Sequence, residues 1–186
     1  MDLLEGIYTR RSVRQYTARP VEREQLVEII KAGTWAPSGL NNQPWRFVIV
    51  REREARARLA EFTKYRTIIE SAPACIAVFI DREAMYNDVK DHQAMGACIQ
   101  NMLLAAHALG LGAVWLGEIL KNAEEVSAVI DPKILMCRHS RGSNRESILL
   151  KRTWTPAFAG MTNIVIFMLF CEPTAHVDSR AGGNPL

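Results

Sequence analysis

A long amphipathic pattern in the middle of the chain constrains the fold more than any other feature. From about Asp91 to Leu109, apolar side chains recur at helical spacing, and Gly110 then ends the pattern as glycine often does after a helix. Small residues such as Gly96 and Ala97 let another helix approach closely. The sequence therefore predicts a long helix with one continuous apolar stripe, made of Met95, Cys98, Ile99, Met102, Ala106 and Leu109.

Short apolar runs predict buried strands before and after this helix. Four such runs are present, at Trp45 to Val50, Cys75 to Ile80, Gly112 to Gly117 and Ile164 to Cys171. Pro73 precedes the second run and Asp81 closes it.

Shorter helical patterns surround the strands. Behind Asp2 as N-cap, an apolar face is formed by Leu3, Leu4, Ile7 and Tyr8. A helix from about Glu22 has Leu26, Ile29 and Ile30 directed inward and Gly33 near its end, and further helices are predicted over Arg51 to Phe62 and from Asn122 to Val129. Because helices and strands mix without strict alternation, an α+β fold is favoured over a doubly wound sheet.

The composition is typical of a soluble globular protein of one domain, residues 1–186. Hydrophobic residues make up 48% and charged residues 23%, and a net charge of +3 is too small to require a nucleic acid or an anionic membrane as partner. The longest apolar run is too short to span a bilayer, and the N-terminus carries Asp2 and Glu5 in place of the basic region of a signal peptide. The four cysteines lack zinc-site spacing and indicate reduced thiols, so we expect a cytoplasmic protein without a metal.

A basic run at residues 10–14 is the first candidate binding motif. It contains Arg10, Arg11, Ser12 and Arg14, and in an extended chain Ser12 and Arg14 point to the same side. The planar guanidinium group matches the geometry of phosphate oxygens. Taken alone, the run is equally typical of a solvated basic turn at the end of a helix.

A proline-led loop at residues 36–45 is the second motif. Pro37 restricts one backbone angle, Gly39 allows a planar ring to approach the backbone closely, and Ser38 and Asn41 offer hydrogen-bonding side chains. An ordinary turn between a helix and a strand would explain most of these residues, but not the ending Asn-Asn-Gln-Pro-Trp. In that ending we expect Trp45 to be a packing residue.

The third motif is the glycine-flanked strand at residues 110–117. It is not a dinucleotide fingerprint. The Gly-X-Gly pattern at residues 110–112 precedes the strand, whereas the fingerprint follows one. On its own it is weak evidence for any function.

In this order, the three motifs resemble the flavin-binding signature of the nitroreductase family, and the resemblance covers residues 1 to about 130. It implies a nitroreductase-like α+β fold, with a central mainly antiparallel sheet flanked by helices, in an intertwined homodimer. It further implies FMN as cofactor, NADH or NADPH as hydride donor, and ping-pong reduction of nitroaromatics, quinones or similar small planar acceptors. Since the flavin would accept and donate the electrons, no catalytic side chain is expected.

The resemblance also implies individual contacts. Arg10 and Ser12 would lie near the phosphate and ribityl chain, Arg14 near the pyrimidine edge of the flavin, and the proline-led loop at the flavin of the other subunit. Lys64 and Arg66 are candidates for ring contacts. The expected cofactor-binding residues are Arg10, Arg11, Ser12, Arg14, Pro37, Ser38, Gly39, Asn41, Leu116, Gly117 and Arg180.

The segment from Cys137 to Thr162 differs from the rest, because amphipathic periodicity gives way to Arg, Ser and Gly. It resembles a translated interspersed repeat, which would make it an atypical inserted segment within the family pattern, and an ordinary long surface loop is the alternative. A long loop is thermodynamically tolerable, so the remainder can still fold.

Other functions remain open. Within enzymes, a family branch could carry out reductive dehalogenation or flavin breakdown, and a different class would be a non-catalytic flavin-binding protein. A nucleic-acid-binding module is disfavoured because no aromatic stacking residues accompany the N-terminal arginines. His92 is interpreted as a surface histidine without an acid partner.

Overall fold

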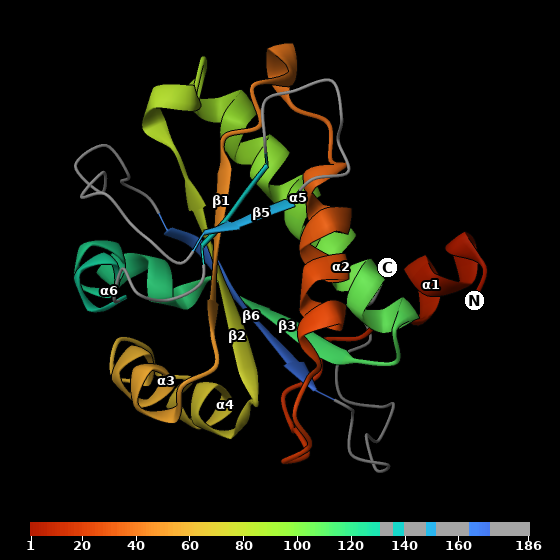
Figure 1. Cartoon of the computed structure of the whole chain (residues 1–186), viewed down its shortest axis with the longest axis vertical. Coiled ribbons are helices and arrows are strands. Elements are labelled where there is room, and N and C mark those ends of the chain that lie inside the picture. The colour runs from red at the N-terminus through yellow and green to blue at the C-terminus, as the bar shows by residue number, and fades with distance from the viewer. Residues whose placement is uncertain (131–135, 140–147, 152–163, 172–186) are drawn as a thin grey trace, which may run out of the picture.

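A six-stranded sheet runs through the centre of the molecule (Figure 1). The structure is a computed structural model that describes residues 1–130, 136–139, 148–151 and 164–171. The strand order is β3-β6-β2-β1-β4-β5, and all five neighbouring pairs are antiparallel. The strands are β1 (Trp45–Val50), β2 (Ala74–Ile80), β3 (Gly112–Leu116), β4 (Met136–His139), β5 (Ile148–Lys151) and β6 (Ile164–Cys171). The predicted α+β fold with a mainly antiparallel sheet is confirmed.

Helices cover both faces of the sheet. In Figure 1, α2 (Arg23–Thr34) and α5 (Asp88–Ala108) lie on one side, and α3 (Arg53–Ala60), α4 (Arg66–Ser71) and α6 (Ala123–Val129) lie on the other. Two apolar clusters follow from this arrangement. Trp45, Phe47 and Ile49 of β1 face the first pair of helices, whereas Val48 and Val50 belong to the cluster with α3, α4 and α6. The alternation of side chains along a strand thus buries both faces of β1.

The long helix confirms the strongest sequence prediction. Its apolar stripe is buried except for Leu109, which follows the last helical residue, and Gly110 has a φ of 75° that favours glycine. The helix begins three residues earlier than predicted, because the side chain of Asn87 accepts a hydrogen bond from the backbone N–H of Lys90 at 3.0 Å.

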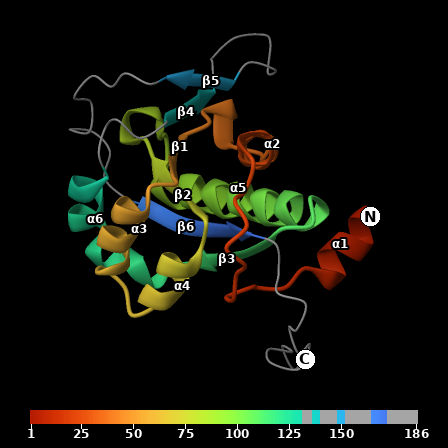
Figure 2. The ribbon, with the colours of Figure 1, turned by 60° about the horizontal axis from the view of Figure 1, so that its bottom comes forward.

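The first helix, α1 (Leu3–Thr9), forms as predicted, but its apolar face is not buried within this chain. Asp2 caps it through a bond from the N–H of Leu3 at 2.7 Å. Leu3 and Tyr8 are nevertheless 69% and 70% exposed. Figure 2 shows α1 beside the C-terminal end of α5, where the Thr9 hydroxyl lies 2.9 Å from Nε2 of His107.

The other predicted elements agree within a few residues, and α4 was missed. The strands at 45–50 and 164–171 have the predicted limits. Helix α4 has only six residues, too few for a clear helical period, and it buries Ile68 and Ile69.

Much of the atypical segment lies outside the described residues. Two parts that are described continue the sheet: β4 pairs with β1, with Cys137 opposite Phe47, and β5 pairs with β4. These two parts are strands, so the surface-loop alternative does not describe them.

Among the described residues, no helix is both long and apolar enough to cross a membrane. Nor does the described part contain three or more His, Cys, Asp or Glu side chains grouped as a metal site would need. Cys75 and Cys98 are free thiols, and burial raises the pKa of each.

Candidate functional site

Arg10 ends α1 with a guanidinium group that lacks a partner. Its Nη1 atom is buried, and no hydrogen-bond acceptor among the described residues reaches it. Burial and, secondarily, the positive charge of Arg11 lower the pKa of Arg10. A buried donor without an acceptor is costly, so an anion that reached this nitrogen would remove the cost.

The other polar residues of the basic run are mostly engaged locally. Nη1 of Arg11 donates to the carbonyl groups of Tyr8 and Arg10, at 2.7 and 2.9 Å, and thereby caps the end of α1. Nη1 of Arg14 donates to the carbonyl of Ser12 at 3.2 Å. Because both side chains and Ser12 are exposed, they remain accessible to a ligand.

The first and third motifs lie side by side. Ser12 forms a parallel bridge with Ala113, and the N–H of Val13 donates to the carbonyl of Ala113 at 3.0 Å. A Cβ atom on Gly112 would lie 2.7 Å from Cγ1 of Val13, closer than real contacts allow. Glycine is therefore required at 112 for the basic run to pack against β3.

The end of β3 combines a buried residue with an exposed one. Leu116 is buried, whereas the side chain of Trp115 before it is 42% exposed. Gly117 is half-buried, and a Cβ there would meet Nε1 of Trp115 at an ordinary 3.7 Å. Packing within the chain does not require glycine at 117, which fits the prediction that this position borders a ligand.

The proline-led loop is strained but heavily braced. Leu40, Asn41 and Gln43 have φ values of 52°, 54° and 48°, in the left-handed region that costs free energy for residues other than glycine. Oγ of Ser38 accepts from the N–H of Gln43 at 3.1 Å, and the Gln43 side chain donates to Oδ1 of Asn41 at 2.9 Å. Two of the predicted ligand contacts, Ser38 and Asn41, thus also hold the loop together, while Pro37 is exposed at its start.

A buried carboxylate connects this loop to the start of α5. Nδ2 of Asn42 donates to Oδ1 of Asp91 at 2.7 Å and to the carbonyl of Ala84 at 2.9 Å. Oδ2 of Asp91 accepts from the N–H groups of Tyr86 and Asn87, each at 2.9 Å. Burial alone would raise the pKa of Asp91, but the bonds from Asn87, Asn42 and Tyr86 outweigh it and lower the pKa.

Within this chain, the ring of Tyr86 packs closely against Gly39. A Cβ at position 39 would lie 2.1 Å from Cε1 and from Oη of Tyr86. The sequence predicted close approach of a ring to Gly39, but not that a side chain of the same protein supplies one.

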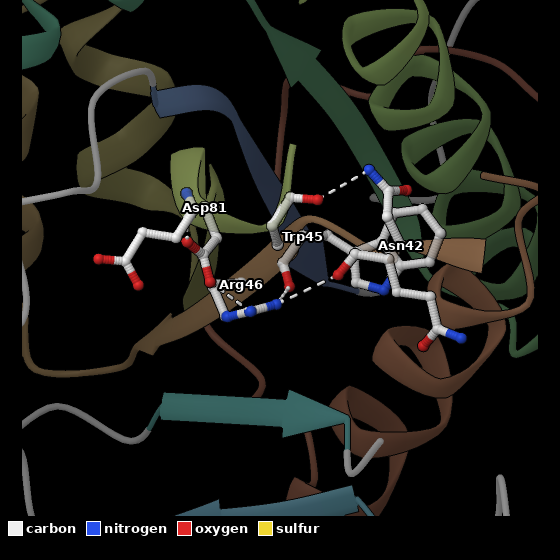
Figure 3. Close-up of polar contacts among 7 residues, drawn as sticks. Asn42, Trp45, Arg46 and Asp81 are labelled. Carbon is white, nitrogen blue, oxygen red and sulfur yellow. Dashed lines mark hydrogen bonds and ion pairs between the residues drawn. The ribbon is translucent and has the colours of Figure 1, made fainter. Parts of the chain in front are cut away.

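An ion pair fastens the other end of the loop to the sheet. Arg46, only 5% exposed, pairs with Asp81 and donates to the carbonyl of Trp45 at 2.7 Å (Figure 3). The N–H of Asp81 donates to the carbonyl of Pro44 at 2.7 Å. Trp45 is buried, as expected of a packing residue.

Glu118, directly after Gly117, was missed by sequence analysis. Its carboxylate pairs with Lys121 and accepts from Oγ1 of Thr63 at 2.7 Å and from the N–H of Lys64 at 3.2 Å. These contacts, with Lys121 the strongest, lower its pKa to about 2. Of the two candidate ring contacts, Lys64 is therefore held beside the end of β3, whereas Arg66 pairs with Glu70 on α4.

The second motif is far from the other two. The contact of α5 with Thr9, directly before the basic run, is at His107, and its contact with the loop is at Asp91. These residues are 16 positions apart on one helix, which corresponds to about 24 Å along its axis. The chain thus joins two of its three motifs, and Arg180 lies outside the described residues.

His92 is half-buried near the start of α5 and has an acid neighbour, contrary to expectation. Nδ1 of His92 lies 3.5 Å from Oδ1 of Asp88, whose side chain is 80% exposed. A histidine that faces an aspartate one turn earlier, on the exposed side of a helix, is typical of a surface position.

Comparisons with known proteins agree with the family resemblance of the sequence. The model of the Nitroreductase family matches residues 7–74 and 63–133. A protein of Methanothermobacter thermautotrophicus, provisionally named an NADH dehydrogenase or NAD(P)H nitroreductase, is 41% identical over 117 residues, which are 63% of this chain and 61% of that protein. The chain thus matches about three fifths of this relative's length.

Two crystal structures show the same fold. One, a provisionally named nitroreductase of Desulfovibrio desulfuricans in complex with FMN, is 40% identical, with a TM-score of 0.77 over 100% of this chain and 93% of that one. The other, the NADPH:FMN oxidoreductase of Vibrio harveyi complexed with NAD+, is 25% identical, with a TM-score of 0.72 over 98% and 72%. None of the comparisons supports the interspersed-repeat interpretation of residues 137–162.

Proposed function

The chain belongs to the Nitroreductase family, and from this premise we propose that it is an FMN-dependent oxidoreductase. In this proposal, NADH or NADPH is the electron donor and a nitroaromatic, a quinone or a similar planar molecule is the acceptor. Support comes from the FMN-bound structure, which is 40% identical, and from a relative named NADPH-flavin oxidoreductase, which is 33% identical over 139 residues.

The single observation that carries the proposal is the buried, unpartnered Nη1 of Arg10. A phosphomonoester carries nearly two negative charges at neutral pH and offers several acceptor oxygens. It would satisfy this donor and relieve the repulsion between Arg10 and Arg11. The donor set therefore fits the FMN phosphate, and the exposed hydroxyl of Ser12 adds a further hydrogen-bonding group.

The remaining groups fit a flat ring system. Main-chain atoms of Leu116 and Gly117 can border it, and glycine at 117 adds no side chain of its own beside the ring of Trp115. The exposed guanidinium of Arg14 can hold negative charge that develops on its polar edge. Bound FMN would supply the two-electron chemistry, so the protein needs to bind, orient and exclude water. Donor and acceptor would occupy the same place in turn, which predicts ping-pong kinetics.

We propose that each site is shared between two chains of a homodimer. Within one chain, the rigid loop at residues 37–43 and the basic run lie at opposite ends of α5, about 24 Å apart along its axis. The exposed apolar side chains of α1, which a monomer would leave in water, also favour self-association. A cytoplasmic location, expected from the widely spaced cysteines, is part of the same proposal.

The first test measures FMN affinity. Arg10→Ala should weaken FMN binding about tenfold to a hundredfold, because a hydrogen bond to a charged group is lost. Arg58→Ala, which removes an exposed arginine from α3, should leave the affinity unchanged.

Purified wild-type protein should be yellow and should be bleached by NADPH without oxygen. Equal FMN affinity of both variants would refute the proposed phosphate site, and a yellow protein that NADPH does not bleach would indicate a non-catalytic flavin-binding protein.

The second test uses mixed dimers. One chain carries Arg10→Ala and the other carries Ser38→Ala with Asn41→Ala. If the loop serves the partner's site, co-expression of the two chains creates one intact site in each mixed dimer, and FMN binding returns. If each chain builds its own site, no intact site forms and FMN binding stays as weak as in the separate homodimers.

A further inference from the structure

Tyr86 presents an aromatic ring at the surface of the proline-led loop. The ring packs against the backbone of Gly39, so closely that any side chain at position 39 would collide with it. It is nevertheless 42% exposed. Part of the ring is therefore fixed against the loop, and the rest is available to another molecule.

The base of this side chain is held as firmly as the loop itself. The N–H of Tyr86 donates to Asp91, which is fully buried and also accepts from Asn42 of the loop. A single carboxylate thus sets the relative position of Tyr86 and the loop. A pre-positioned aromatic ring loses little conformational freedom when it binds a ligand.

A cation accompanies the ring. Nζ of Lys90, on the first turn of α5, lies 5.7 Å from the centroid of the Tyr86 ring. The acidic neighbours on this turn have partners of their own, since Asp91 accepts three hydrogen bonds and Asp88 faces His92. A partly exposed aromatic ring with an ammonium group over it suits a planar molecule that carries a negative charge.

We propose that Tyr86 and Lys90 recognise the electron acceptor, and that they favour a planar aromatic molecule with an anionic substituent. This inference rests on the proposed function, because it places the acceptor next to the loop that serves the cofactor site. Tyr86 would stack on the ring of the acceptor, and Lys90 would attract its carboxylate or a similar group.

Two probes of matched shape test the proposal, 4-nitrobenzoate and its neutral analogue 4-nitrobenzamide. The dissociation constants of both for the oxidised, FMN-loaded protein are measured by calorimetry, and the KM values by steady-state kinetics. Tyr86→Ala should weaken both probes about threefold to tenfold, while Tyr86→Phe, which keeps the ring, should stay close to wild type. Lys90→Gln should weaken 4-nitrobenzoate about threefold and leave 4-nitrobenzamide unchanged.

The outcomes separate this inference from the proposed function. An FMN-loaded protein that NADPH reduces, but whose Tyr86→Ala variant binds both probes as tightly as wild type, overturns the role of Tyr86 alone. Equal effects of Lys90→Gln on the two probes overturn the preference for anions. A wild-type protein that binds no FMN overturns the proposed function and this inference together.

Discussion

The charged groups at the two ends of helix α5 differ in how the protein pairs them. At the C-terminal end, Nη1 of Arg10 is buried and has no partner among the described residues. At the N-terminal end, Asp91 is fully buried and accepts three hydrogen bonds from the protein itself, although Oδ1 of Asn42 is also buried there without a partner among the described residues. Since unsatisfied buried polar atoms are costly and rare in folded proteins, the proposed ligand would complete the pairing of Arg10, whereas Asp91 is paired already.

The contacts near the N-terminal end of α5 explain how the loop at residues 37–43 can keep three residues other than glycine in the left-handed region. Such residues persist only where the surroundings hold them, and here Asp91, Ser38 and the pair Arg46–Asp81 hold the loop. The loop therefore needs no ligand to keep its shape. A rigid segment of this kind can be offered to a second chain at little entropic cost.

The largest expected effect comes from removing the carboxylate of Asp91. Asp91→Ala removes the acceptor that the N–H groups of Tyr86 and Asn87 share with the amide of Asn42, and should lower the free energy of unfolding by about 3 kcal/mol. Asp88→Ala, at an exposed position three residues earlier, should cost less than about 1 kcal/mol. Urea denaturation of the FMN-free protein measures both, and equal losses would contradict the special role of Asp91.

Asp91 also predicts how stability depends on pH. The pKa of its carboxyl is lower in the folded protein than in the unfolded chain, so the ionised form stabilises the fold. This contribution is fully present above the ordinary pKa of an aspartate and is lost as the pH falls through the lowered folded value. The acid limb of wild-type stability should therefore be steeper than that of Asp91→Ala.

A smaller effect is expected at the contact between Gly39 and Tyr86. Gly39→Ala places a methyl group where the tyrosine ring lies, and should cost about 2 kcal/mol because the ring must move. In a Tyr86→Ala background the collision disappears, so the same change should cost less than about 1 kcal/mol. A thermodynamic cycle of the four proteins measures the coupling, and additive effects would show that the ring does not restrict position 39.

The elements at both ends of α5 could be predicted from the sequence, but their partners could not. Helical periodicity located α5 and α2, and apolar runs located β1 and β6, because both signals lie within a few neighbouring residues. The contact between Asn42 and Asp91 joins residues 49 positions apart. No local sequence pattern at either position predicts this contact, so Asp91 was interpreted only as the start of a helix.

The same reasoning explains what was and was not predicted at the basic run. The motif indicated where a phosphate could bind, since arginine and serine are suited to it wherever they occur. It did not indicate which arginine is buried without a partner, because burial depends on how α1 meets α5 and β3. Of the two neighbouring arginines, Arg11 donates to nearby carbonyl groups, and only the structure separates its role from that of Arg10.

The smallest expected effect tests most directly whether Arg10, unlike Asp91, needs a ligand to complete its contacts. In the FMN-free protein, Arg10→Met replaces a poorly solvated cation with an apolar chain of similar length, and should raise the free energy of unfolding by up to about 1 kcal/mol. With FMN in excess the order should reverse, because a ligand stabilises the folded state in proportion to its affinity and the variant has lost the phosphate contact. Urea denaturation with and without FMN measures the reversal, and Arg58→Met, at an exposed position of α3, should leave the difference between the two conditions as in wild type. If Arg10→Met destabilised the FMN-free protein, the guanidinium would have a structural role there, and Arg10 would need no ligand to complete its contacts, like Asp91 near the other end of α5.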